Sequence, residues 1–144
     1  MATRKELRAA ITEARGRVQR AIVESAPEWN TPGAATEGEE AWSPRQAMEH
    51  LVGAEVRQAS NISLACGYPP LQAEPPELPA AADAAQQYAL AMQKADSILQ
   101  YVTDEDLLKV VPEGRMAGRS VEDLMQTMAR HANEHADQAL ATAR

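Results

Sequence analysis

The sequence contains no phenylalanine, a single cysteine and no long apolar run, and each absence excludes a class of protein. Cys66 has no partner for an intramolecular disulfide, so a disulfide-stapled secreted scaffold is excluded and a reducing compartment is expected. No segment approaches the roughly 18 apolar residues that a membrane-spanning helix needs. The charged N-terminal segment also has no apolar core of a signal peptide. We therefore expect a cytoplasmic protein that does not bind membranes.

Positive charge is also scarce. The chain carries 14 Lys and Arg against 21 Asp and Glu, for a net charge of −7. Nucleic-acid binding needs clustered cations, and the one short group, Arg4, Lys5 and Arg8, is interpreted as a solvated helix face. Nucleic acid is therefore not an expected partner.

Alanine dominates the composition, with 29 residues in a chain of 144. Alanine is the strongest helix former and a weak strand residue, so an all-α fold is predicted. The length fits one domain spanning residues 1–144. Such a domain buries roughly two-thirds of its unfolded surface and needs no metal to fold. A bound metal would therefore serve chemistry.

Four amphipathic segments are predicted as helices, and long connections separate them. Two begin with capping boxes, Thr3 with Glu6 and Ser43 with Gln46. The predicted helices cover about residues 3–26, 43–66, 80–101 and 120 to near the C-terminus. Helices without any strand pattern indicate a four-helix bundle. The connections 27–41 and 67–79 exceed the usual length, so we expect them to cross helix ends or line the mouth of a site.

The three histidines form the most informative pattern. His131 and His135 are one helical turn apart and continue an apolar stripe, so they should share an inward face. His50 lies on an apolar face of the second helix, and alanines beside all three leave room for the rings. Three imidazoles without a fourth protein ligand are typical of a metal site that keeps one position open for chemistry. The alternative is that each is an ordinary hydrogen-bonded core side chain.

Two further features lie beside these histidines. Gln138 follows His135 by about one turn and is a candidate hydrogen-bond partner for a metal ligand, although it could equally be a polar residue at the bundle end. Residues 131–135 (HANEH) also match the pattern of inverted zinc metallopeptidases. Those enzymes take a downstream acidic ligand, and no Glu follows His135. We interpret that match as chance.

The order of these motifs resembles the DinB-like family of four-helix bundle proteins. Residues 42–51 (WSPRQAMEHL) resemble the start of that family's second helix, and His131-x-x-x-His135-x-x-Gln138 resembles its closing pattern. The resemblance implies an up-down-down-up bundle, with His50, His131 and His135 as metal ligands. It also implies a divalent metal ion, zinc or nickel first and iron as an alternative, and a homodimer. Family members include transferases that use the low-molecular-weight thiols bacillithiol, mycothiol or glutathione, and many others have no established activity.

Three functions therefore remain open from the sequence. The first is a metal-dependent S-transferase that acts on a small-molecule substrate with such a thiol. The second is a metal-dependent hydrolase, and the third is a non-enzymatic bundle that binds a metal or a small molecule. No catalytic residue and no organic cofactor site can be assigned, and Cys66 is expected to be a buried thiol without a catalytic role.

Overall fold

The structure, a computed structural model, describes residues 2–143 and is built from four long helices. These are α1 (Arg4–Ser25), α2 (Pro44–Ala65), α3 (Ala81–Leu99) and α4 (Val121–Ala143), with short 3-10 helices η1 (Ala26–Glu28), η2 (Glu39–Ala41) and η3 (Asp104–Leu108). Within the described residues there is no β-strand, only one bridge between Val110 and Ser120. No helix of that range combines the length and hydropathy of a membrane-spanning segment. The all-α prediction is confirmed.

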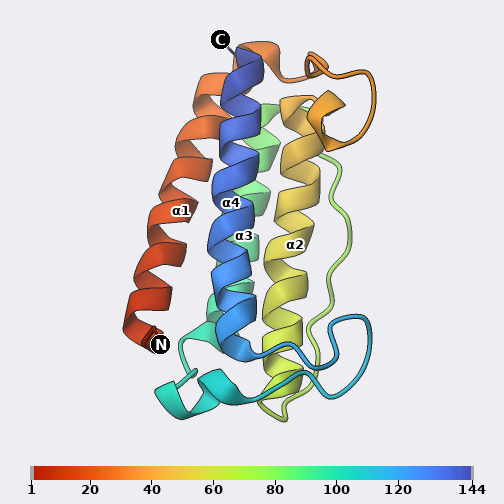
Figure 1. The fold of residues 1–144 in the computed structure, drawn as a ribbon. Helices are drawn as coiled ribbons and strands as arrows, with labels where there is room; N and C mark the ends of the chain where they lie inside the picture. The colour runs from red at the N-terminus through yellow and green to blue at the C-terminus, as the bar shows by residue number, and fades with distance from the viewer. Residues whose placement is uncertain (1, 144) are drawn as a thin grey trace.

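The helices run up, down, down and up, as Figure 1 shows. The parallel pair α2 and α3 is possible because residues 66–80 return along the length of the bundle beside α2. Ser60 holds this segment by accepting a hydrogen bond from the Leu71 amide (2.9 Å). α1 packs mainly against α4, while α2 packs against both α3 and α4. The predicted bundle topology is confirmed.

Local signals account for most helix ends. The Ser43 hydroxyl accepts a hydrogen bond from the Gln46 amide (3.2 Å), which satisfies a donor at the start of α2. Gly67 follows the end of α2 with φ +85°, a conformation that glycine adopts without steric cost. α3 ends two residues before the predicted Tyr101. The Tyr101 amide bonds to the Ile98 carbonyl (3.1 Å), so the chain tightens into a 3-10 turn there.

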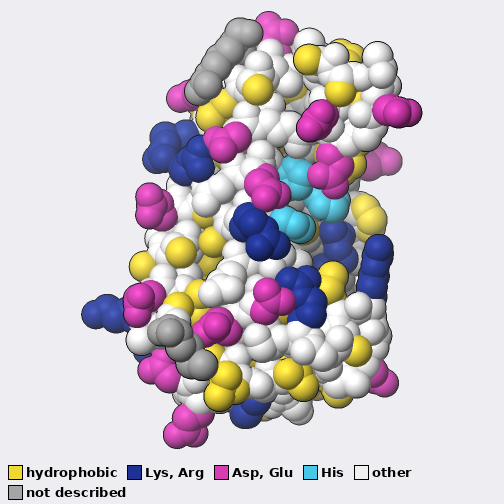
Figure 2. All heavy atoms as spheres, in the orientation of Figure 1, with side chains coloured by type: hydrophobic (Ala, Val, Ile, Leu, Met, Phe, Trp, Pro, Cys, Tyr) yellow, Lys and Arg dark blue, Asp and Glu magenta, His cyan; other side chains and the backbone are white. Residues whose placement is uncertain are grey.

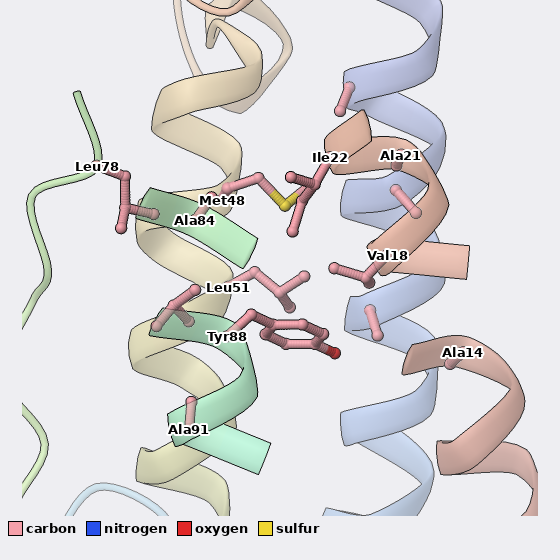
Figure 3. Packing of buried hydrophobic residues seen from close by; sticks show 14 of the residues in the cluster. Ala14, Val18, Ala21, Ile22, Met48, Leu51, Leu78, Ala84, Tyr88 and Ala91 are labelled. Carbon is pink, nitrogen blue, oxygen red and sulfur yellow. The ribbon is translucent and has the colours of Figure 1, made fainter. Parts of the chain in front are cut away.

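Small side chains allow the four helices to approach closely. Figure 3 shows Tyr88, Leu51 and Met48 directed into the space between the helices, with alanines at the contacts. The fully buried Tyr88 supplies aromatic volume in a chain without phenylalanine. Trp29 adds to this core, because it is 5% exposed and its indole nitrogen donates to the Leu78 carbonyl (2.8 Å). That contact ties the 27–41 connection to the 67–79 connection.

A buried ion pair links the first three helices. The Arg15 guanidinium of α1 contacts the Glu55 carboxylate of α2, with Nε to Oε1 at 2.7 Å, and Asp96 of α3, with Nη1 to Oδ1 at 2.9 Å. The Glu55 side chain is only 3% exposed. Burial raises the pKa of Glu55, and the neighbouring Arg15 charge opposes that rise. Sequence patterns did not indicate this cluster.

Candidate metal centre

The three histidines gather at the seam between α2 and α4. Figure 2 shows their side chains as one patch on the surface. The ring centres of His50 and His135 are 5.1 Å apart, and those of His131 and His135 are 6.0 Å apart. His135 is therefore the central member, with one neighbour from α2 and one from its own helix.

The depth of the rings differs from the sequence prediction. His135 is 4% exposed, as expected for an inward residue, while His50 and His131 are half-buried. The space between the helices beside them is already filled by Met48 and Leu51, which are almost completely buried. The cluster consequently lies at the outer edge of the α2–α4 contact, where a small molecule from solvent can reach it.

Trp42 covers one side of the histidine pair. Its ring stacks on that of His135 at 6.0 Å with an interplanar angle of 17°, and it lies tilted against His50 at 5.3 Å. In the sequence, this residue stands out only as the first of the WSPRQAMEHL motif. Its position directly before Ser43, the N-cap of α2, places it above the first turns of that helix. Trp42 thus shields the two rings from water on that side.

Gln138 selects the tautomer of His135. The Gln138 amide nitrogen donates to the carbonyl oxygen of Glu39, which can only accept. The amide oxygen Oε1 therefore faces Nδ1 of His135, at 3.0 Å, and that ring nitrogen must carry the proton. The lone pair of a neutral His135 is then on Nε2, free to bind a ligand. The 27–41 connection also reaches the site through Glu39.

The surroundings favour neutral rings on the other two histidines. Burial lowers the pKa of His50, and repulsion from His135 lowers it further. The pKa of His131 is lowered by the same two causes in the same order. Glu39 opposes both shifts, whereas Arg57 on the His50 side and Arg130 on the His131 side reinforce them. Imidazole binds metal in its neutral form, so these environments suit ligand residues at neutral pH.

The donor set fits a divalent metal ion in chemistry, and the rings lie near one another without forming a finished site. An ion about 2 Å from one nitrogen of each imidazole places neighbouring ring centres roughly 5 Å apart. The His50–His135 spacing of 5.1 Å is close to this value, and the His131–His135 spacing of 6.0 Å is wider. Nδ1 of His131 is buried and has no hydrogen-bond partner among the described residues, so it is available as a donor atom. Within residues 2–143, however, no group of three or more His, Cys, Asp or Glu side chains is arranged to hold one ion. Binding of one ion by all three histidines would require at least one imidazole ring to rotate.

Two other sequence candidates lie outside the cluster. Glu134 is exposed and faces Arg130, with Oε1 and Nε 3.8 Å apart, so it occupies no ligand position. Cys66 lines a separate cavity of about 680 Å³ at the C-terminal end of α2. Burial raises the pKa of its thiol, which leaves less of the nucleophilic thiolate at neutral pH.

Replacing Gln138 with Leu should weaken metal binding by about 10- to 100-fold, the usual effect of losing a partner that orients a ligand histidine. The physical reason is that Nδ1 of His135 would lose its acceptor, so the ring could adopt the other tautomer. Competition with a chromophoric chelator measures the affinity. Gln126→Leu, at an exposed position of the same helix, is the matched control. Equal affinity in the two variants would show that Gln138 has no such role.

Comparison with known proteins gives a single result. The model of the DinB superfamily matches residues 12–139, a range that includes all three histidines as well as Trp42 and Gln138. No curated protein and no solved structure matches the chain.

Proposed function

This chain belongs to the DinB superfamily, and we propose that it binds one divalent metal ion through His50, His131 and His135. The observation that carries the proposal is the adjacency of the rings, since His135 neighbours His50 across the α2–α4 seam and His131 on its own helix. Zinc or nickel is proposed first and iron as the alternative, because imidazole suits all three.

The residues around the rings prepare them for this role. Gln138 holds His135 in the tautomer that leaves Nε2 free, and Trp42 covers the ring on its other side. The half-buried His50 and His131 keep one face of the cluster open to solvent. A divalent ion held by three imidazoles lowers the pKa of a bound water or thiol, which supplies a nucleophile at neutral pH.

We further propose that the reaction is thiol S-transfer with a low-molecular-weight thiol such as bacillithiol, mycothiol or glutathione. Within the described residues, the side chains other than histidine that stack on or hydrogen-bond to the histidine rings are Trp42 and Gln138, and neither is a nucleophile. Cys66 lies in a different cavity. The attacking atom must then come from outside the chain, as a thiol or as water. The thiol is the choice that the family resemblance supports, and water would make the protein a hydrolase.

Elemental analysis of tag-free protein tests the metal proposal. We expect close to one zinc or nickel ion per chain after purification without added metal. Protein that contains no metal, and that takes up none on dialysis against zinc or nickel, would contradict the proposal and favour a non-enzymatic bundle. Light scattering on the same sample checks the homodimer that the resemblance implies.

A thiol screen tests the reaction. Electrophilic substrates are offered with bacillithiol, mycothiol or glutathione, and product is followed by mass spectrometry. We expect turnover that requires both metal and thiol, and turnover nearly unchanged in Cys66→Ala because that thiol is remote and protonated. Turnover without any thiol would assign a hydrolase instead. Loss of turnover in Cys66→Ala would show that this cysteine is the nucleophile.

A further inference from the structure

Arg57 lies on the same face of α2 as His50. Seven residues along an α-helix correspond to a rotation of only about 20° from the starting face and a rise of roughly 10 Å. The Arg57 side chain is exposed and therefore stands in line with His50, nearly two turns further along the helix.

Gly53 lets the Arg57 side chain fold back toward the histidines. A Cβ atom at Gly53 would come within 2.7 Å of Nη1 of Arg57 and within 3.7 Å of its Cζ. The guanidinium thus lies over Gly53, about 4 to 5 Å along the axis from His50. Any side chain at position 53 would occupy that space. Because glycine has no side chain, the Arg57 guanidinium can lie in this space and so stays near the histidines.

Arg57 has no protein anion as a partner. Within the described part of the chain, five arginines form ion pairs with carboxylates: Arg15, Arg17, Arg45, Arg119 and Arg130. Arg57 takes part in none of them, nor in any side-chain hydrogen bond there. A guanidinium presents parallel N–H donors that match a carboxylate. Its whole donor set is available to a ligand.

The charges around the histidines are divided between two sides. Figure 2 shows Asp and Glu side chains directly above the histidine patch, and Lys and Arg side chains beside and below it with some acidic side chains among them. Glu39, in the short helix before α2, belongs to the acidic side, and its carbonyl accepts the hydrogen bond from Gln138. Arg57 is further down α2, on the opposite side of His50. Because Arg57 has no ion-pair partner within the described residues, an anionic group would be attracted to its side of the rings and repelled by the acidic side chains above them.

We propose that Arg57 binds a carboxylate group of the molecule that reacts at the histidine centre. This carboxylate subsite rests on the proposed function, because it would select the molecules that bind at the histidine centre. Because the guanidinium lies over Gly53, within about one helical turn of His50, the carboxylate should be only a few bonds from the atom held at the histidines. The substrate or thiol is then a small carboxylic acid, and neutral analogues of the same size bind more weakly.

The test compares two thiols of equal size on zinc-loaded protein. Calorimetry gives the affinities of 3-mercaptopropionate and of its uncharged amide, 3-mercaptopropanamide. We expect the carboxylate to bind at least about fivefold more tightly, the effect of a charge-assisted hydrogen bond at a partly exposed site. Arg57→Gln should remove the preference while leaving the affinity for the amide unchanged. Arg20→Gln, at an exposed position of α1, is the matched control and should keep the preference.

Gly53→Ala supplies an independent variant. The new methyl group would displace the guanidinium without removing its charge, so the preference should fall although Arg57 is still present. Circular dichroism checks that each variant is folded. Equal affinities of the two thiols for the wild type, or an undiminished preference in Arg57→Gln, would overturn the proposal.

A measurement without metal separates this proposal from the proposed function. Propionate is titrated into metal-free protein, and the side-chain Nε–H signal of Arg57 is followed by NMR. We expect a saturable shift at Arg57 and none at Arg20. If zinc does not bind but the shift is present, the metal proposal fails and the carboxylate subsite stands. If zinc binds but Arg57 shows no shift and no preference, only the subsite is wrong.

Discussion

His135→Ala should abolish stoichiometric metal binding. His135 is the member of the cluster that neighbours both other rings, and it is the most deeply buried of the three. Removing it leaves His50 and His131 without the ligand that connects them. The loss should exceed the roughly 100-fold that removal of an orienting partner causes. Elemental analysis after dialysis against zinc or nickel measures it directly.

Thermal unfolding adds a second measure of the same prediction. A metal ion at 1,000 times its dissociation constant stabilises the folded protein by about 4 kcal/mol if it binds only the folded state. Wild-type protein should therefore gain stability on addition of metal, and His135→Ala should not. Metal-free His135→Ala should itself unfold at a lower temperature than metal-free wild type, because the variant loses a buried ring that stacks on Trp42. The effect of metal is therefore compared within each protein, with and without the ion. If His135→Ala retains one ion per chain, His135 is not a metal ligand and the proposed site is wrong.

The fold could be predicted from sequence because its signals are local. Ser43 with Gln46 marks the start of α2, and Gly67 marks its end through a left-handed backbone conformation. These features depend on residues within one turn of each other, so neither needs the rest of the molecule. The tightened end of α3 was missed, since the Tyr101 amide could have continued the helix equally well by local criteria.

The site could be predicted only in part, because it depends on how whole helices are rotated against each other. Helical spacing brings His131 and His135 to one face, and they do lie together. The exposure of His50 and the stacking of Trp42 on His135 result from packing between α2 and α4, which sequence periodicity does not specify. The Glu39 carbonyl is a backbone atom of a connection, so no side-chain pattern could have indicated its contact with Gln138.

The Arg15–Glu55 pair was missed for a related reason. Each residue is charged and lies within an amphipathic helix, where a charge usually marks the solvated face. Both side chains are buried here, and the two residues are 40 positions apart in the sequence, one in α1 and one in α2. Only the assembled bundle shows that two charges have been placed in its interior together.

Arg15→Met should lower the free energy of unfolding by about 3 to 5 kcal/mol, the effect of leaving one charge of a buried pair uncompensated. The Glu55 carboxylate would then be buried without the guanidinium that now contacts it at 2.5 and 2.7 Å. Asp96 is less affected, because its side chain is 47% exposed and can be solvated. Urea unfolding of metal-free protein measures the change at neutral pH.

The loss should depend on pH in a defined direction. Arg15 opposes the rise that burial causes in the pKa of Glu55, so removing Arg15 raises this pKa further above its value in the unfolded chain. A carboxyl group with a raised pKa in the folded state favours folding at low pH, and this contribution is lost as the pH rises through the folded pKa. The destabilisation of Arg15→Met should thus be smallest near about pH 4 and grow toward neutral pH.

The double variant Arg15→Met with Glu55→Leu separates burial of a lone charge from loss of packing. Replacing both partners of a buried pair by apolar side chains is often neutral or stabilising. The double variant should therefore recover most of the stability that Arg15→Met loses. Its free energy of unfolding should also lack the pH dependence, between about pH 4 and neutral pH, that the Glu55 carboxyl causes in Arg15→Met. If the double variant is as unstable as the single one, the pair contributes through shape and helix contact, and the charge of Glu55 is not the cause.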